Sequence, residues 1–343
     1  MAASGRSVRI AGEDSGVARM EQGETASGAR VAAIDVARGV ALIGMALYHL
    51  SWDFAYFHIA PAEFPVVPPM RAFSHAVAAA FLMLAGVSLA LAHRGAIRWR
   101  AFLRRLAVVG GAAALLTLAT YLYAPQQAIF FGILHCMAVA SLLATPLLGA
   151  PAWVALVVSA AVIAAPWLVV SPAFNSPALV WLGLGTVAPQ TLDWRPLTPW
   201  AGPVFLGLAL TRLNFARLSA SPLWRWRPAA RAGRALAFAG RHSLAIYLIH
   251  QPILFGILFA ATALTGFTAA REREEFAAVC QRECVAGGGE LAFCATVCAC
   301  VTHGLQQAGL SRAVARDSLD DAQRRDYSRI VRACSAGQPA EGE

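Results

Sequence analysis

DVARGVALIGMALYHLSWD, residues 35–53, predicts an apolar helix that is long enough to cross a lipid bilayer. The stretch nevertheless contains four ionisable side chains, those of Asp35, Arg38, His49 and Asp53. Successive residues of an α-helix are rotated by about 100°, so these four side chains fall within one stripe about 100° wide. We therefore expect one face of this helix to carry a polar stripe.

The polar stripe has to meet protein, water or a ligand, because an ionisable side chain in hydrocarbon costs at least about 2.5 kcal/mol. Intramembrane ionisable groups are functional sites by default. The alternative is a purely structural seam of ion pairs between helices, with Asp35 and Asp53 at the two membrane interfaces. Asp35 and Arg38 can pair with each other, or Arg38 can bind an anionic group that enters from the cytosol.

The composition predicts an all-α, polytopic membrane protein. The chain has 343 residues and is 58% hydrophobic and 14% charged, whereas a soluble domain is roughly 25% charged. Its net charge of +9 comes from arginines that lie between apolar segments, so they indicate membrane topology and no nucleic-acid partner. The chain contains no lysine, which excludes a lysine Schiff-base mechanism.

Apolar segments of spanning length predict about seven transmembrane helices, at 32–55, 70–92, 104–123, 127–149, 151–171, 197–214 and 236–264. The first is expected to be a retained span and not a cleaved secretory signal. Arginines concentrate before the first span, between the second and third, and between the sixth and seventh. The positive-inside rule then puts the N-terminus in the cytosol and the C-terminus in the periplasm of a bacterial inner membrane. A shorter apolar piece, 176–190, is predicted to be interfacial or re-entrant.

Three regions follow from this pattern: a disordered cytosolic arm at 1–29, a transmembrane domain at 30–266, and an extracytoplasmic cysteine-rich tail at 267–343. The tail holds six cysteines, and two pairs of them are spaced by four residues, so that each pair lies on one helix face. A helical hairpin that turns at residues 287–289 can join Cys280 to Cys298 and Cys284 to Cys294, which leaves Cys300 for Cys334. Six cysteines allow fifteen pairings, and reduced thiols or a metal site remain as alternatives. Disulfides are favoured because the predicted compartment is oxidising.

Several side chains in the predicted bundle can carry chemistry. His49 can take a proton from a nucleophile or briefly carry an acyl group, and Asp53, one turn further on, can orient its ring. Other polar groups at comparable depth are candidate substrate-binding residues: Asp35, His75, His135, His250 and Gln251. The sequence contains no glycine-rich phosphate loop, no HExxH helix and no GxSxG nucleophile elbow, and no metal site is predicted.

Three ordered motifs resemble the bacterial branch of the heparan-α-glucosaminide N-acetyltransferase family. They are residues 34–53, FGILHC at 131–136 and GRHSLAIYLIHQP at 240–252, and the resemblance covers roughly 30–262. The ten residues between Arg38 and His49 also resemble the arginine–histidine motif of integral-membrane acyltransferases that modify bacterial surface polysaccharides. The resemblance implies an enzyme that takes acetyl from cytosolic acetyl-CoA, with His49 as the catalytic histidine and Arg38 as its companion.

We therefore expect an acyltransferase that moves an acyl group from acyl-CoA to a hydroxyl or amine of an envelope glycan. Acetyl is the acyl group we favour. Its partners would be membrane lipid, the acyl-CoA co-substrate and the glycan, while the oligomeric state is left open. Arginines at the cytosolic side can bind the CoA phosphates, or can act as topology signals alone: Arg98, Arg100, Arg104 and Arg105. The alternatives are a transporter of a small polar or anionic solute and a scaffold that displays the cysteine-rich tail.

Overall fold

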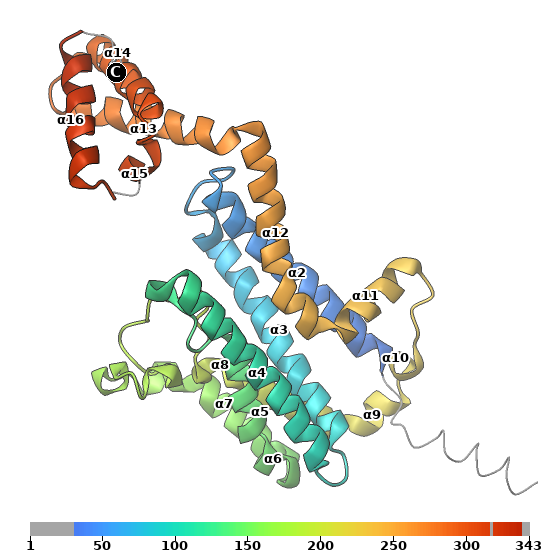
Figure 1. The fold of residues 1–343 in the computed structure, drawn as a ribbon. Coiled ribbons are helices and arrows are strands. Elements are labelled where there is room, and N and C mark those ends of the chain that lie inside the picture. The colour runs from blue at the N-terminus through green and yellow to red at the C-terminus, as the bar shows by residue number, and fades with distance from the viewer. Residues whose placement is uncertain (1–30, 316–317, 338–343) are drawn as a thin grey trace, which may run out of the picture. The chain divides into compact units, whose positions relative to one another are not determined.

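The computed structural model describes residues 31–315 and 318–337, and every regular element within them is a helix (Figure 1). The predicted arm at 1–29 lies outside the described residues. The all-α class expected from the composition is confirmed for the described part of the chain.

Among the described residues, four helices are long and apolar enough to cross a membrane: α2 (Ala32–Tyr56), α3 (Pro68–Ala92), α4 (Trp99–Tyr123) and α12 (Ser243–Thr265). The chain is therefore a membrane protein. Three shorter helices occupy the other predicted segments: α5 (Ile133–Leu143), α7 (Ala152–Leu168) and α8 (Leu197–Leu213). Four spans are thus supported by helix length, and a total of seven stays a prediction.

Two of the predicted segments are interrupted. The segment 127–149 contains α5 and the short α6 (Thr145–Gly149), which meet at Ala144. Pro146 explains this break, because it has no backbone N–H to donate to the Leu142 carbonyl, which accepts a hydrogen bond of 2.8 Å from the Thr145 hydroxyl instead. The predicted start of the segment 236–264 was wrong, since residue 236 lies inside α11 (Arg231–Arg241) and α12 begins at Ser243. Arg241 and His242 are polar and exposed, so the apolar run hid a helix boundary.

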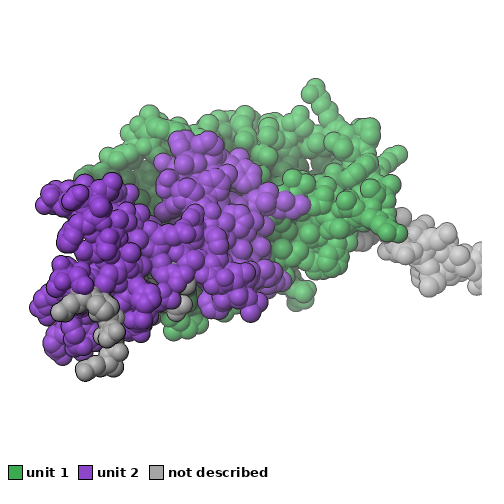
Figure 2. All heavy atoms as spheres, turned by 90° about the horizontal axis from the view of Figure 1, so that it is seen from above, with its two compact units in different colours: residues 1–42, 79–246 green, residues 43–78, 247–343 purple. Residues whose placement is uncertain are grey.

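The chain divides into two compact units (Figure 2). Unit 1 comprises residues 1–42 and 79–246, of which those from 31 onward are described, and unit 2 comprises 43–78 and 247–343. Helices α2, α3 and α12 each contribute residues to both units, and each unit is described below by itself.

The core of unit 1 is built around α8. Most of this helix is buried, and it packs on α7 and α5. A hydrogen bond of 2.8 Å from the Ser159 hydroxyl of α7 to the Gly202 carbonyl of α8 links the two helices inside the core. The connection between them holds η4 (Pro172–Asn175) and η5 (Val180–Leu182), so the apolar piece at 176–190 contains one 3-10 turn. Shorter elements complete the unit: η3 (Pro125–Gln127), α9 (Phe215–Ala220) and α10 (Pro222–Arg225).

Unit 2 contains parts of α2, α3 and α12 and a small helical tail. After η2 (Phe64–Val66) and the first part of α3, the unit resumes in α12, and the chain turns at Gly266 into α13 (Figure 1). The tail consists of α13 (Phe267–Ala286), α14 (Leu291–Gln307), α15 (Ser311–Ala315) and α16 (Asp321–Ser335). Its core gathers Val301, Leu305, Leu310 and Cys334 with apolar side chains from the surrounding helices.

Three disulfides hold the tail together: Cys280–Cys298, Cys284–Cys294 and Cys300–Cys334. The first two join α13 to α14 across the turn, and the third joins α14 to α16. Gly288 adopts a φ of +91°, which glycine tolerates without strain. A Cβ atom on Gly289 would lie 2.5 Å from the Cys294 sulfur, so the turn is shaped by the adjacent disulfide.

The loop between α3 and α4 contains a histidine that the structure requires to be neutral. His93 is 7% exposed, and its Nδ1 accepts a hydrogen bond of 3.2 Å from the Arg98 backbone N–H at the start of α4. Burial, reinforced by the charges of Arg98 and Arg105, lowers the pKa of His93 below its ordinary value. Protonation would break the hydrogen bond and place a third positive charge beside two arginines.

We expect the stability contributed by neutral His93 to be fully present above the unfolded-state pKa of about 6.5 and to be lost as the pH falls through the lower folded-state pKa. Unfolding midpoints of the wild type and of His93→Asn, measured between pH 8 and pH 5, test this. Asparagine can accept the same hydrogen bond and does not titrate, so the wild-type midpoint should fall more steeply below pH 6.5. Parallel profiles would show that His93 does not sense pH in the folded protein.

Candidate functional site

A cluster of four polar side chains in unit 2 brings together two motifs that are nearly 200 residues apart. His49 and Asp53 come from α2, and His250 and Gln251 come from α12. The rings of His49 and His250 lie 4.9 Å apart between centroids and are inclined at 68°, an edge-to-face arrangement. We call His49, Asp53, His250 and Gln251 the histidine cluster.

Asp53 and Gln251 form the polar floor of the histidine cluster. The Gln251 side-chain amide donates a hydrogen bond of 2.6 Å to Asp53 Oδ1, and Asp53 is only 2% exposed. Two further oxygens, Asp53 Oδ2 and Gln251 Oε1, are buried without a hydrogen-bond partner among the described residues. Both atoms are acceptors, and a buried acceptor without a donor is costly. The site is therefore suited to a ligand that brings its own N–H or O–H groups.

The proton on His250 can be assigned from its backbone contact. Its Nδ1 lies 2.7 Å from the Tyr247 carbonyl oxygen, and a carbonyl can only accept, so Nδ1 carries the proton. In the neutral ring the Nε2 atom then holds the lone pair, which is the form that a general base needs. Pro252 follows Gln251 directly and, having no N–H, leaves the Leu248 carbonyl without its usual helical donor.

Aromatic rings close off the next helical turn beyond the histidine cluster. Phe255, four residues after Gln251, lies 5.2 Å from the Tyr56 ring and 5.0 Å from the Phe57 ring between centroids. Phe57 is buried. An apolar wall of this kind lowers the local dielectric constant and strengthens the interactions of the charged and polar groups beside it.

The N-terminal half of the predicted polar stripe belongs to unit 1. Arg38 donates a hydrogen bond of 3.1 Å to Asp35 Oδ1, forming an ion pair, and its other terminal nitrogen donates to the Ser88 hydroxyl of α3. Asp35 is 4% exposed, while Arg38 is half-buried. The stripe thus faces protein at both ends of α2, as the cost of exposing charges to lipid requires.

His135 is bound into the start of α5. Its Nδ1 accepts a hydrogen bond of 3.3 Å from the Gly132 N–H, and its Nε2 lies 3.2 Å from the Thr117 hydroxyl of α4. Asp193 lies at the same helix end and accepts a hydrogen bond of 2.8 Å from the Ile133 N–H. Burial raises the pKa of Asp193, against the opposing influence of Arg195, this N–H group and His135. The FGILHC motif therefore forms the start of α5, where His135 and Asp193 accept hydrogen bonds from backbone N–H groups.

The other residues expected at the site belong to α3, to α4 and to the loop between them. His75 is on an exposed face of α3, whereas its neighbour Ser74 is buried. Arg98 donates through Nε to the Ala92 carbonyl at 3.1 Å, which ties it to the loop around His93. Arg100 and Arg104 are exposed on α4, and Arg105 is half-buried.

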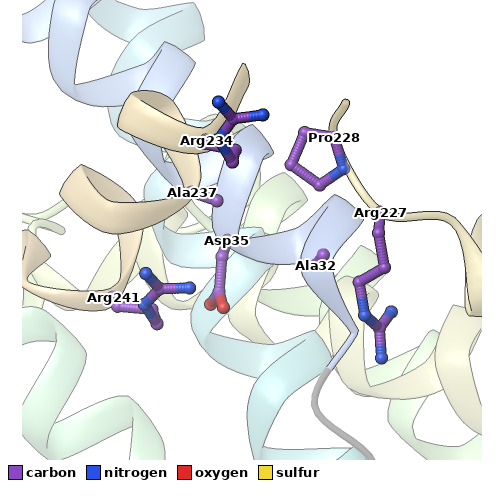
Figure 3. A pocket seen from close by; sticks show the side chains of 7 residues that line it. All are labelled: Ala32, Asp35, Arg227, Pro228, Arg234, Ala237 and Arg241. Atoms are coloured by element: carbon purple, nitrogen blue, oxygen red, sulfur yellow. The ribbon is translucent and has the colours of Figure 1, made fainter. Parts of the chain in front are cut away.

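A cavity of about 380 Å³ in unit 1 was not anticipated from the sequence. It is lined by Ala32, Asp35, Arg227, Pro228, Arg234, Ala237 and Arg241 (Figure 3), and we call it the arginine cavity. The sequence did contain one indication of this cavity, because its three arginines are spaced by seven residues. This spacing places Arg234 and Arg241 on nearly the same side of α11. From the sequence, Arg227 and Arg234 were interpreted as topology signals and Arg241 as an anchor at the membrane interface, so the spacing itself was missed.

The hydrogen bond between Asp53 and Gln251 can be tested by a double-mutant cycle. Asp53→Ala leaves the Gln251 amide buried without its acceptor and should lower the free energy of unfolding by about 1–3 kcal/mol. Adding Gln251→Leu should recover part of this loss, giving a coupling energy of about 0.5–3 kcal/mol. The measurement is denaturant unfolding of the four proteins in detergent.

The matched control for this cycle combines Asp53→Ala with Gln307→Leu, since Gln307 is exposed on α14. These two changes should add within about 0.5 kcal/mol. Additive behaviour of Asp53 and Gln251 themselves would mean that their contact does not stabilise the fold.

Within the described ranges, no group of three or more His, Cys, Asp and Glu side chains could hold a metal ion. Comparison with known families matches residues 30–252 to the catalytic region described as heparan-alpha-glucosaminide N-acetyltransferase, catalytic. No curated protein matches the chain, and no solved structure matches it. The matched range includes every residue of the histidine cluster and of the arginine cavity.

Proposed function

The chain belongs to the heparan-α-glucosaminide N-acetyltransferase family, and from this premise we propose that it transfers an acyl group from acyl-CoA to an envelope glycan. Acetyl is the proposed acyl group, and a hydroxyl or amine of the glycan is the proposed acceptor. The proposal places the protein in the bacterial branch of the family and in the bacterial inner membrane. Its N-terminus would lie in the cytosol, with seven spans between residues 30 and 266 and the cysteine-rich tail in the periplasm.

The observation that carries this proposal is the histidine cluster. A neutral imidazole can remove the proton from an acceptor hydroxyl or amine. The buried acceptor oxygens Asp53 Oδ2 and Gln251 Oε1 suit a substrate with several donor groups, as a sugar has. His49 supplies the imidazole in the proposal, with His250 packed against its ring.

The proposed reaction can follow either of two balanced routes. In the direct route, the acceptor oxygen or nitrogen attacks the thioester carbonyl, a C–O or C–N bond forms, and the C–S bond to CoA breaks. The imidazole takes the acceptor's proton and passes it to the leaving thiolate. In the covalent route, a histidine nitrogen attacks the thioester carbonyl, a C–N bond forms, and the C–S bond breaks so that CoA leaves as its thiolate. The acceptor then attacks the acyl-imidazole, its oxygen or nitrogen bonds to the acyl carbon as the C–N bond to histidine breaks, and its proton passes through the imidazole to the thiolate.

The decisive experiment supplies purified protein with radiolabelled acetyl-CoA and an envelope extract. Label that moves to glycan with the wild type, with one free CoA thiol released per transfer, supports acyl transfer. A protein that takes a solute into vesicles and consumes no CoA would be a transporter instead. Omitting the glycan separates the two routes, because only the covalent route leaves labelled protein.

A further inference from the structure

The arginine cavity has a composition that none of the proposed chemistry uses. Its lining contains three guanidinium groups, from Arg227, Arg234 and Arg241, and one carboxylate, from Asp35. Figure 3 shows the side chains of Arg234 and Arg241, both from α11, near Asp35. Arg227 comes from the preceding loop and lies across the cavity from Arg241. The cavity therefore has an excess of positive charge.

The carboxylate in the cavity is already engaged. Asp35 Oδ1 is bound by Arg38, a residue outside the lining. Arg227 donates to the Trp226 carbonyl at 3.0 Å, and Arg234 donates to the Ala229 carbonyl. Within the described part of the chain, no ion pair joins a carboxylate to any of the three cavity arginines. The positive charges of these three guanidinium groups are therefore available to bind an anionic ligand.

The walls of the cavity are held by close backbone contacts. A Cβ atom on Gly240 would lie 1.7 Å from the Asp35 backbone oxygen, so α11 and α2 touch through this glycine. A Cβ atom on Gly233 of α11 would lie 2.7 Å from the Cβ of Pro228 in the preceding loop, so this proline lies against the first turn of α11. The contact keeps the loop that carries Arg227 beside α11. The cavity is thus set by main-chain packing and exists before a ligand binds.

We propose that the arginine cavity binds the phosphate groups of a ligand that carries more than one phosphate. Arg234 and Arg241 are seven residues apart, which separates their Cα atoms by about 10 Å along α11, and Arg227 adds a third donor. Guanidinium groups bind phosphate oxygens through paired hydrogen bonds. The volume of about 380 Å³ falls in the usual range for small-molecule sites.

Two sources could supply phosphates of this kind: the nucleotide part of acyl-CoA and the headgroups of anionic phospholipids. Assignment to acyl-CoA rests on the proposed function, whereas phosphate binding itself does not. Under this assignment, the CoA phosphates bind Arg227, Arg234 and Arg241. The arginines that the sequence suggested for this role would then not bind phosphate: Arg98, Arg100, Arg104 and Arg105. A binding assay without an acceptor separates the two questions, because it needs no acyl transfer.

The test measures binding of adenosine 3′,5′-bisphosphate to full-length protein in detergent. Arg234→Gln with Arg241→Gln should weaken binding by a hundredfold or more, since each lost charged contact is worth about tenfold. Arg217→Gln removes an exposed arginine of α9 outside the cavity and should leave the Kd unchanged. Arg241→Lys keeps the charge and the fold but loses the paired hydrogen bonds, so an intermediate Kd is expected.

The second arm identifies a lipid occupant. Protein purified with native lipid is analysed for bound phospholipid, and bisphosphate binding is repeated in nanodiscs with and without phosphatidylglycerol. Anionic lipid retained by the wild type and lost by the double variant assigns the cavity to headgroups. Bisphosphate affinity that depends on the cavity arginines in both kinds of nanodisc assigns it to the nucleotide. If the double variant matches Arg217→Gln in both arms, the proposal is overturned.

Discussion

Replacing His49 with alanine is expected to lower the rate of acyl transfer about 10²- to 10⁴-fold, the usual contribution of a general base. The half-buried ring of His49 packs edge-to-face on His250, and the pair lies beside the Asp53–Gln251 hydrogen bond. Alanine removes the imidazole and leaves the buried acceptor oxygens in place. The measurement is release of CoA thiol at saturating acceptor, with folded protein verified by its unfolding midpoint.

His303→Ala is the matched control, because His303 is exposed on α14 of the tail and should leave the rate unchanged. His250→Ala adds a second comparison. If the two rings act as one proton-transfer unit, the double variant should be little slower than His49→Ala alone. A His49→Ala protein within threefold of the wild-type rate would remove His49 from the chemistry.

Removing the Cys300–Cys334 disulfide is expected to lower the free energy of unfolding of the tail by about 4 kcal/mol. This bridge closes a 34-residue separation and ends in the tail core, where Cys334 is buried among Val301, Leu305 and Leu310. The chain-entropy estimate grows with the length of the closed loop. Changing both cysteines to alanine and following protease cleavage of residues 267–337 at increasing denaturant gives the loss.

The Cys284–Cys294 bridge provides the matched comparison. It closes a separation of only 10 residues, so its removal should cost about 3 kcal/mol, roughly 1 kcal/mol less than removal of Cys300–Cys334. Both double-alanine variants change the same number of sulfur atoms. Equal losses would show that loop length does not set the effect, and no loss in either variant would show that the tail core is stable without its bridges.

Features that depend on short stretches of chain could be predicted from the sequence. Cys280 and Cys284 lie on one helix face and Cys294 and Cys298 on the next, so a hairpin brings them together, and the disulfides of the structure join these pairs. The polar stripe on α2 follows in the same way from helical periodicity. Asp35 and Asp53 are both buried, although they lie at opposite ends of the helix.

Features that depend on contacts between distant segments could not be predicted. His250 and Gln251 were recognised as polar groups, but nothing local indicated that they would meet His49 and Asp53. The arginine cavity forms because Gly39 and Gly240 let α2 and α11 approach backbone to backbone, and a glycine in an apolar run gives no sign of its partner. The break at His242 was hidden because the hydropathy of a long window averages over two polar residues.

The disulfides of the tail also allow the number of reactive thiols to show on which side of the membrane the tail lies. Of seven cysteines, six are bridged in the structure and Cys136 is the free thiol. A maleimide mass tag applied to denatured protein will add one increment where the tail has matured in an oxidising compartment, and seven after reduction. A gel shift of protein denatured directly from cells can thus report on which side of the bilayer the carboxyl-terminal region folded, without any added fusion or engineered cysteine.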